Sequence, residues 1–414
     1  MIIEILATGD EIRTGAVVDT NSAHIARALK DIGLVVVRHS CVGDDVNHLA
    51  STLKEISVRA DVAVVTGGLG PTTDDITAEA AAKSAGVELV LNRSALRRVE
   101  DYFRARNRST SSSNKKQAML PFGAEAIYNP VGTAPGFNLR IERCLFYFLP
   151  GVPFEMHRML SDSVLSAIDR LRGGGSEIRR IKTLSTFGLT ESATVERVKG
   201  FSAEFPGIKL GFRAKFPEIQ IKLYGSGKDS KTLDKLLNNA TESVLKIMGE
   251  NVFSVDGRAM EAVVGSLLAE KKATLAVAES CTGGLISHLL TNIPGSSEYF
   301  LFSGVTYSND AKTKILDVSP DLIQQFGAVH EKTAKEMAAG ARRIAGATYG
   351  LAVTGIAGPG GGTDDKPVGT VWIGIADARS SRGFHFYFPF NNRSRNKKIF
   401  AMKALDILRR ELMG

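Results

Sequence analysis

The sequence predicts an α/β protein with three domains: an N-terminal parallel-sheet domain at 1–172, a small α+β domain at 176–255 and a C-terminal α/β domain at 257–414. Two observations predict this organisation. In the first and last ranges, short apolar segments alternate with amphipathic helical segments, as in parallel sheets covered by helices on both faces. Between them, the pattern changes after a glycine run at 173–175, and 414 residues are too many for one ordinary core.

In the N-terminal range, the first expected strand is 2–7, and the first helix begins after Asp19. Residues 19–22 supply N-cap side chains for that helix. Its apolar residues share one face, at Ile25, Ala28, Leu29 and Ile32. A strand at 34–37, a helix from Val46 and a strand at 62–66 are expected to follow. The Ser-rich basic segment 108–116 is expected to be a mobile surface loop.

The glycine run itself is expected to be a flexible break. The middle range predicts a strand at 180–186, a short helix, a hairpin across 208–224 and a helix at 233–248. In the C-terminal range we expect helices at 260–270, 285–290 and 333–345, and strands at 274–278, 305–308, 350–354 and 371–376.

Composition is that of a soluble globular protein, with 43% hydrophobic and 23% charged residues and no apolar run long enough to span a membrane. Cys41, Cys144 and Cys281 are scattered, which favours neither a disulfide framework nor a metal motif and indicates a cytoplasmic protein. The net charge of +8 is spread along the chain without interleaved aromatic residues, so nucleic acid is an unlikely partner.

A glycine-rich loop, Gly-Gly-Leu-Gly-Pro-Thr-Thr-Asp-Asp-Ile-Thr, follows the expected strand at 62–66. Glycines at the carboxyl end of a parallel strand let backbone N–H groups approach a phosphate. The loop is not a Walker P-loop, because it has no Lys, and it lacks the dinucleotide GxGxxG spacing. Asp74 and Asp75 are candidate ligands for a divalent cation, with helix capping as the alternative.

Three more loops of this kind follow or precede expected strands: Thr-Gly-Asp-Glu at 8–11, Asn-Pro-Val-Gly-Thr-Ala-Pro-Gly at 129–136 and Leu-Pro-Gly-Val-Pro-Phe-Glu at 149–155. One such loop is usually a tight turn, but four at one sheet edge indicate a binding site.

The motifs TGDEI, DTNS, GGLGPTTDDIT, NPVGTAPG and LPGVPFEM resemble the N-terminal domain of the CinA family, which is similar to molybdopterin-binding MogA and MoeA. The resemblance covers about residues 1–170 and implies a metal-dependent pyrophosphatase that cleaves ADP-ribose to AMP and ribose 5-phosphate. Asp75 matches an Asp of the molybdopterin-binding motif, whereas Asp74 stands where Arg is frequent, which favours a different ligand. The expected nucleotide-binding residues are Gly9, Glu11, Asn21, Gly67, Gly68, Gly70, Pro71, Thr72, Asn129, Gly136, Gly151, Pro153 and Glu155.

A second constellation begins at Ser280, which follows the expected strand at 274–278 and precedes a helix. A hydroxyl at such a turn faces free N–H groups and suits a nucleophile, although Ser280 or Thr282 alone is more often an N-cap. No Ser-His-Asp pattern is present, so Lys312 is the better candidate base if burial lowers its pKa. Tyr307 could relay a proton, Asn309 could bind an amide or ribose, and Cys281 is the rival nucleophile.

The segments AESCTGG, SGVTYSNDAK and AVTGIAGPGG resemble the C-terminal CinA domain, a nicotinamide mononucleotide (NMN) deamidase of the PncC type, across about residues 257–412. The resemblance implies that Ser280 is the nucleophile, Lys312 the base and Tyr307 an assisting group, with nicotinate mononucleotide and ammonia as products and no cofactor. The expected substrate-binding residues are Glu279, Thr282, Gly283, Gly284, Asn309, Thr354, Gly355 and Gly358.

The middle range resembles a KH-type domain but lacks a clear GxxG clamp for RNA. The sequence analysis therefore predicts a bifunctional enzyme acting on NMN and ADP-ribose, with a divalent metal such as Mg²⁺ or Co²⁺ in its N-terminal domain and a homodimeric state. Two alternatives stay open: a non-catalytic protein of competence or DNA repair, and a molybdopterin-binding N-terminal domain.

Overall fold

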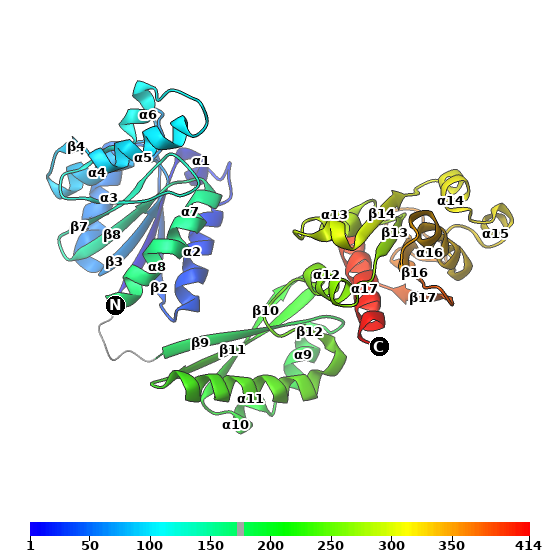
Figure 1. Cartoon of the computed structure of the whole chain (residues 1–414). Helices are drawn as coiled ribbons and strands as arrows, with labels where there is room; N and C mark the ends of the chain where they lie inside the picture. The colour runs from blue at the N-terminus through cyan, green and yellow to red at the C-terminus, as the bar shows by residue number, and fades with distance from the viewer. Residues whose placement is uncertain (172–177) are drawn as a thin grey trace. The chain divides into compact units, whose positions relative to one another are not determined.

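The structure, a computed structural model, describes residues 1–171 and 178–414 (Figure 1). Its contacts divide the chain into two compact units. The N-terminal unit comprises Met1–Ile181 and Ser226–Asp234, and the second unit comprises Lys182–Gly225 and Lys235–Gly414. The expected break at the glycines 173–175 lies outside the described residues.

The N-terminal unit contains a six-stranded sheet in the order β2-β1-β3-β8-β7-β6. The central strands β1 and β3 are buried along their whole length, as the apolar sequence predicts. Strands β2, β1, β3 and β8 are parallel. Strand β7 is antiparallel to β8, because a two-residue turn joins them, and β6 is antiparallel to β7 in turn. The strands are β1 Ile3–Thr8, β2 Val36–Val42, β3 Val62–Thr66, β6 Glu125–Ile127, β7 Gly136–Ile141 and β8 Cys144–Leu149; β4 Leu89–Leu91 and β5 Met119–Pro121 pair separately.

Helices cover both faces of this sheet and form two apolar cores (Figure 1). The side chains of Asp19 and Asp45 accept from first-turn N–H groups of α2 and α3, and the cap at Asp19 is among those that the sequence predicts. The helices are α1 Asp10–Arg13, α2 Thr20–Asp31, α3 Val46–Arg59, α4 Thr77–Ala85, α5 Arg93–Arg104, α6 Ser112–Lys116, α7 Pro153–Met159 and α8 Leu165–Arg170, with a π-turn at Leu160–Val164 between the last two.

The prediction of a loop over residues 108–116 is wrong for its second half, because residues 112–116 form the helix α6. Ser111 and Asn114 exchange side-chain to backbone hydrogen bonds in a capping box, which stabilises this short helix without apolar residues.

The middle segment folds into a four-stranded sheet in the order β10-β11-β9-β12. The predicted hairpin forms in the register Ile208↔Gly225 to Lys215↔Glu218. Its elements are β9 Ile178–Thr186, β10 Ile208–Lys215, β11 Glu218–Gly227, β12 Val252–Ser254, α9 Glu191–Arg197, α10 Phe201–Glu204 and α11 Ser230–Met248.

The C-terminal segment has a five-stranded sheet in the order β14-β13-β15-β16-β17, in which β14, β13 and β15 are parallel. The strands are β13 Leu275–Glu279, β14 Phe300–Val305, β15 Tyr349–Gly355, β16 Thr370–Ala376 and β17 Ser381–Tyr387. The helices are α12 Met260–Glu270, α13 Leu285–Thr291, α14 Asn309–Leu316, α15 Pro320–Phe326, α16 Glu331–Ala345 and α17 Arg393–Met413.

The expected strand at 305–308 is wrong, because β14 ends at Val305. Ser308 instead caps α14 by accepting from the N–H of Ala311, so the chain must turn between the two elements.

Within the second unit, the middle and C-terminal segments share contacts. Buried Arg409 of α17 donates to the carbonyl of Glu250 at 2.8 Å and to the carboxylate of Asp406. At the other end of α17, the Arg395 guanidinium lies 4.6 Å from the ring centre of Phe216 in the β10–β11 hairpin and 5.1 Å from that of Phe390. The two segments therefore pack as one body.

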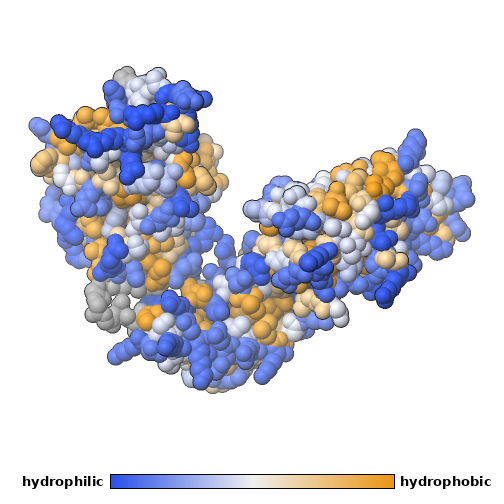
Figure 2. Space-filling model, in the orientation of Figure 1, coloured by the Kyte–Doolittle hydropathy of each residue, from blue (hydrophilic) through white to orange (hydrophobic). Residues whose placement is uncertain are grey.

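Apolar residues lie in separate patches between hydrophilic ones on the face shown in Figure 2. Among the described residues, no helix has the length and apolar character that crossing a membrane requires.

Candidate functional site

Ser280 and Lys312 meet at the carboxyl end of the C-terminal sheet. Ser280 is the first residue after β13, where its N–H donates to the carbonyl of Val353 in the neighbouring strand at 3.0 Å. Lys312 lies one turn inside α14 and is only 1% exposed. Its Nζ is 3.2 Å from Ser280 Oγ, so two residues 32 positions apart are within hydrogen-bond reach.

The surroundings of Lys312 favour its neutral form. Its Nζ also donates to the carbonyls of Thr306 at 2.9 Å and Tyr307 at 3.2 Å. Burial lowers the pKa of Lys312, since the charged ammonium is desolvated. A neutral amine has two N–H groups and one lone pair; with both N–H groups on the carbonyls, its lone pair faces the Ser280 hydroxyl. This arrangement can accept a proton from Ser280.

The turn after Ser280 exposes backbone N–H groups. Gly283 and Gly284 have φ of 59° and 89°, a left-handed conformation that disfavours other residues. In the described part of the chain, the N–H of Thr282 donates to no carbonyl or side chain. Such a group beside a nucleophile can bind an oxyanion.

Glu279, expected to bind substrate, is fully buried and faces the start of α13. Its carboxylate accepts from the N–H groups of Ile286 at 3.1 Å and Ser287 at 2.9 Å. Glu279 therefore stabilises the start of α13, behind the turn that follows Ser280.

Tyr307 is 59% exposed and bonds to a residue that the sequence analysis missed. Arg393, the first residue of α17, donates to Tyr307 Oη and to the carbonyl of Gly358, both at 2.8 Å. One turn along α17, Lys397 Nζ lies 3.4 Å from the position that a Cβ on Gly283 would take. Two cations of α17 thus border the Ser280 turn.

The other residues that were predicted to bind substrate make different local contacts. Thr354 Oγ1 donates to the carbonyl of Ala328, Gly355 ends β15, and exposed Asn309 opens α14. The buried hydroxyls of Thr282 and Thr306 have no hydrogen-bond partner among the described residues. Each could be satisfied by a bound ligand or water.

Cys281 belongs to the apolar core of this segment. Burial raises its thiol pKa to about 12. A thiolate nucleophile is thus disfavoured at this position.

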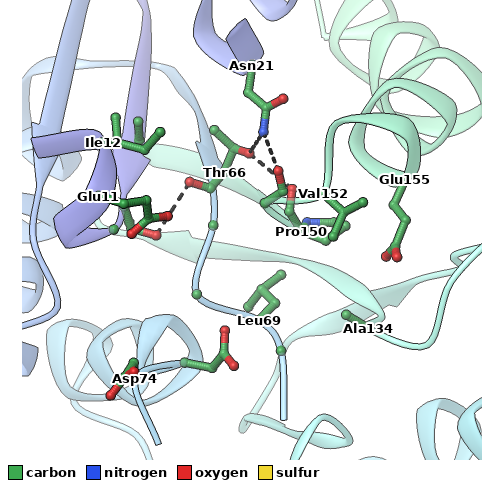
Figure 3. Close-up of a pocket in the computed structure, with 18 of the residues that line it drawn as sticks. Glu11, Ile12, Asn21, Thr66, Leu69, Asp74, Ala134, Pro150, Val152 and Glu155 are labelled. Carbon is green, nitrogen blue, oxygen red and sulfur yellow. Dashed lines mark hydrogen bonds between the residues drawn. The ribbon is translucent and has the colours of Figure 1, made fainter. Parts of the chain in front are cut away.

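A second candidate site is a cavity of about 520 Å³ in the N-terminal unit (Figure 3). It lies at the carboxyl ends of β1, β3 and β8, where open parallel sheets bind ligands. Gly67 and Gly68 line it with φ of 112° and 65°, and a Cβ on Gly67 would lie 2.5 Å from the carbonyl oxygen of Thr8. The loop backbone thereby comes close to the neighbouring strand.

Most of the predicted nucleotide-binding residues line this cavity: Gly9, Glu11, Asn21, Gly67, Gly68, Gly70, Pro71, Thr72, Gly151, Pro153 and Glu155. Asn21 donates to Thr66 Oγ1 and to the carbonyl of Gly151, which joins two of the loops. Gly136 is not in the lining; it starts β7, where a Cβ would contact the carbonyl oxygen of Phe148. Asn129 is not in the lining either, but it donates to Glu155 Oε2 at 2.7 Å.

The cavity is acidic. Its lining contains six carboxyl side chains and no Lys or Arg: Glu11, Asp19, Asp44, Asp74, Asp75 and Glu155. Burial and the charges of Asp10, Glu11 and Asp74 raise the pKa of Asp44, and burial raises that of Glu155. A doubly charged pyrophosphate would enter such a cavity only with a cation.

The two candidate metal ligands differ. Asp75 Oδ2 accepts from the N–H and the hydroxyl of Thr72 at 2.8 and 2.6 Å, so this oxygen holds the loop. Asp74 is exposed at the cavity rim, and its negative charge contributes to raising the pKa of Asp44. Among the described residues, no group of three or more His, Cys, Asp or Glu is arranged to hold a metal ion.

Three family models match consecutive parts of the chain. They are a probable molybdopterin binding domain at residues 4–170, a damage-inducible protein CinA KH domain at 181–254 and the CinA C-terminal domain at 257–412.

Curated relatives match over the full length. A CinA-like protein from Desulfosudis oleivorans is 54% identical over 413 residues, covering 100% of both chains. Another from Desulforapulum autotrophicum is 48% identical, covering 100% of this chain and 99% of the relative. Among solved structures, a competence/damage inducible protein from Agrobacterium tumefaciens is 36% identical and covers 37% of this chain and 94% of its own, with a TM-score of 0.36.

Proposed function

The chain belongs to the CinA-like proteins, and from that premise we propose that it is a bifunctional hydrolase of nicotinamide nucleotide turnover. Its C-terminal segment converts NMN to nicotinate mononucleotide and ammonia. The observation that carries this proposal is the buried Lys312 Nζ, which lies 3.2 Å from Ser280 Oγ and donates to the backbone carbonyls of Thr306 and Tyr307.

In the first half of the reaction, Ser280 Oγ attacks the carboxamide carbon while its proton passes to the neutral Lys312 amine. The N–H of Thr282 is a candidate donor to the developing oxyanion. Lys312 then gives its proton to the amide nitrogen, and ammonia leaves as the carbon–nitrogen bond breaks. The product is an ester of Ser280 with the pyridine carboxylate.

In the second half, water loses a proton to Lys312 as it attacks the ester, and the Ser280 oxygen leaves and recovers the proton. Arg393 and Lys397 would bind the phosphate at the other end of NMN. Tyr307 then orients Arg393 through its hydroxyl, which is a different role from the proton relay expected from the sequence.

Ammonia release from NMN tests this proposal. We expect wild-type activity, and loss of about 10³-fold or more in Ser280→Ala and Lys312→Met. Lys314→Met is the matched control, because Lys314 lies on the same helix, is exposed and pairs only with Asp310. Wild-type protein that releases no ammonia from NMN, or a Lys312→Met variant as active as Lys314→Met, would contradict the mechanism.

For the N-terminal cavity, we propose hydrolysis of ADP-ribose to AMP and ribose 5-phosphate. The acidic lining without Lys or Arg supports a requirement for a divalent ion, which would be held by Asp74 and Asp44 with the substrate phosphates. When bound, such an ion neutralises phosphate charge and activates water. Asn21 and Glu155 are then positioned to orient the substrate. AMP formation with and without added Mg²⁺ or Co²⁺ tests the proposal.

We also propose that the protein is cytoplasmic and homodimeric. All three cysteines are free, which agrees with a reducing compartment. Sedimentation would measure the oligomeric state. Strong salt-dependent binding of nucleic acid would favour the alternative role in competence or repair, and bound pterin after purification would favour the molybdopterin alternative.

A further inference from the structure

A second cavity of about 400 Å³ lies beside the acidic one in the N-terminal unit. Its walls come from α5, the turn after α5, and the segment 126–135. Thr133 lines both cavities, so the loop that carries it separates them. Figure 3 shows Ala134 of this loop and Glu155 on the same side of the acidic cavity.

The dividing loop is held rigidly. Asn129 Nδ2 donates to the carbonyl of Ala134 at 2.9 Å and to Glu155, and its Oδ1 accepts from the N–H groups of Val131 and Gly132. Both N–H groups of this buried amide and its oxygen are therefore occupied, by the loop itself and by Glu155 of the acidic cavity. The wall of the second cavity is preformed.

The second cavity has the opposite charge from the first. Arg98 and Arg106 line it, and within the described residues neither guanidinium has an acidic partner. Asp101 also lines it but pairs with Arg104 at 3.0 Å. The cavity therefore presents two uncompensated cations that can bind a phosphate.

Two aromatic rings stand beside these cations. Arg98 lies 4.6 Å from the ring centre of Tyr128, and Arg106 lies 3.6 Å from that of Tyr102. Tyr128 is 53% exposed, so its ring retains area on which a planar group can stack. Aromatic rings next to arginines recur where nucleobases and phosphates bind.

We propose that this second cavity binds a nucleoside monophosphate, with the base stacked on Tyr128 and the phosphate at Arg98 and Arg106. The inference rests on the proposed hydrolysis of ADP-ribose and deepens it: the AMP half of the substrate occupies this cavity, and the ribose 5-phosphate half occupies the acidic one.

Calorimetric titration of AMP into the full chain in the presence of a chelator tests the site separately from catalysis. We expect binding without a divalent ion, weakened at least about fivefold in Tyr128→Ala and in Arg98→Gln. Arg97→Gln is the matched control, because Arg97 is exposed on the same helix and does not line the cavity. Ribose 5-phosphate, which lacks a base, should be insensitive to Tyr128→Ala.

The outcomes separate the two proposals. AMP binding that Tyr128→Ala weakens, in a protein that does not cleave ADP-ribose, would keep the site and refute the pyrophosphatase. Cleavage of ADP-ribose with the same KM in Tyr128→Ala, Arg98→Gln and Arg97→Gln would refute the site. AMP binding that requires Mg²⁺ and is lost only in Asp74→Asn would place AMP in the acidic cavity and also overturn the inference.

Discussion

The Ser280–Lys312 site and the acidic N-terminal cavity lie at the same kind of place, the carboxyl end of parallel strands, but they are prepared for chemistry in different ways. At Ser280, the proposed nucleophile, the proposed base and a free N–H group all come from the chain. In the N-terminal cavity, six carboxyl side chains face one another with no Lys or Arg in the lining. Sheet topology therefore determines where both sites lie, whereas the charge of the lining residues determines whether a cation is needed to bind the ligand.

Chelation should separate the two sites most strongly. Removing divalent ions should lower ADP-ribose hydrolysis about 100-fold or more and leave ammonia release from NMN unchanged. Both activities are measured in one preparation treated with EDTA and then resupplied with Mg²⁺. Pyrophosphatase activity that survives chelation would break the comparison, because the acidic cavity would then bind pyrophosphate unaided.

The pH dependence of the amidase should report Lys312. Only the neutral amine accepts a proton, so kcat/KM should rise about tenfold per pH unit at low pH and level off above the pKa of Lys312. Because burial lowers that pKa, the plateau should begin below the ordinary value of 10.5. A profile that still climbs at that pH would mean that Lys312 is solvated in the protein.

Asp74 and Asp75 should respond differently to the same substitution. Asp74→Asn should raise the Mg²⁺ concentration for half-maximal ADP-ribose hydrolysis about tenfold, since one ligand loses its charge. In Asp75→Asn the loop loses its charged acceptor for Thr72, so the main effect should be on KM. Equal effects on the Mg²⁺ requirement would assign both carboxylates to the ion.

The buried amine should also leave a signature in stability. With a lowered folded-state pKa, Lys312 binds fewer protons in the folded than in the unfolded protein, so its contribution to stability rises with pH up to the unfolded value. The free energy of unfolding of wild type relative to Lys312→Met should rise by at most about 1.4 kcal/mol per pH unit within that window. Urea unfolding followed by Trp372, the one tryptophan, reports on the second unit, which contains Lys312. A pH-independent difference would contradict the shift.

The smallest effect is expected at Cys281. Because its thiol is buried with a pKa near 12, Cys281→Ala should leave ammonia release within about twofold of wild type. Thiol-alkylating reagents should likewise spare the activity of folded protein. Loss of ammonia release in a folded Cys281→Ala variant would instead indicate that the thiol is the nucleophile.

Sequence reasoning succeeded where local signals fix the structure. Buried strands such as β3 and β13 follow from apolar runs, and the turns after them place Gly67 and Ser280 at the carboxyl ends of their respective sheets. Lys312 was found because it follows a strand-like segment, although that strand ends at Val305 instead of 308. Asp44 was missed because the expected strand ended at residue 37, whereas β2 continues to Val42 and places Gly43 and Asp44 directly after it.

Other parts were not accessible from local patterns. Arg393 and Lys397 reach the Ser280 turn only because α17 packs back against the C-terminal sheet from 80 or more residues further along the chain. Tertiary packing of this kind leaves no periodic signal. The second N-terminal cavity is similar, since its arginines on α5 look like an ordinary solvated face until the loop at 129–135 closes beside them.

The contacts at both ends of α17 bear on how this protein could have been assembled from separable genes. A fragment beginning at residue 257 would contain every group assigned to the amidase, yet it would lack Phe216 beside Arg395 and the carbonyl of Glu250 that Arg409 bonds. Separating the segments would thus remove contacts at both ends of α17, with Phe390 still beside Arg395 and Asp406 still bonded to Arg409.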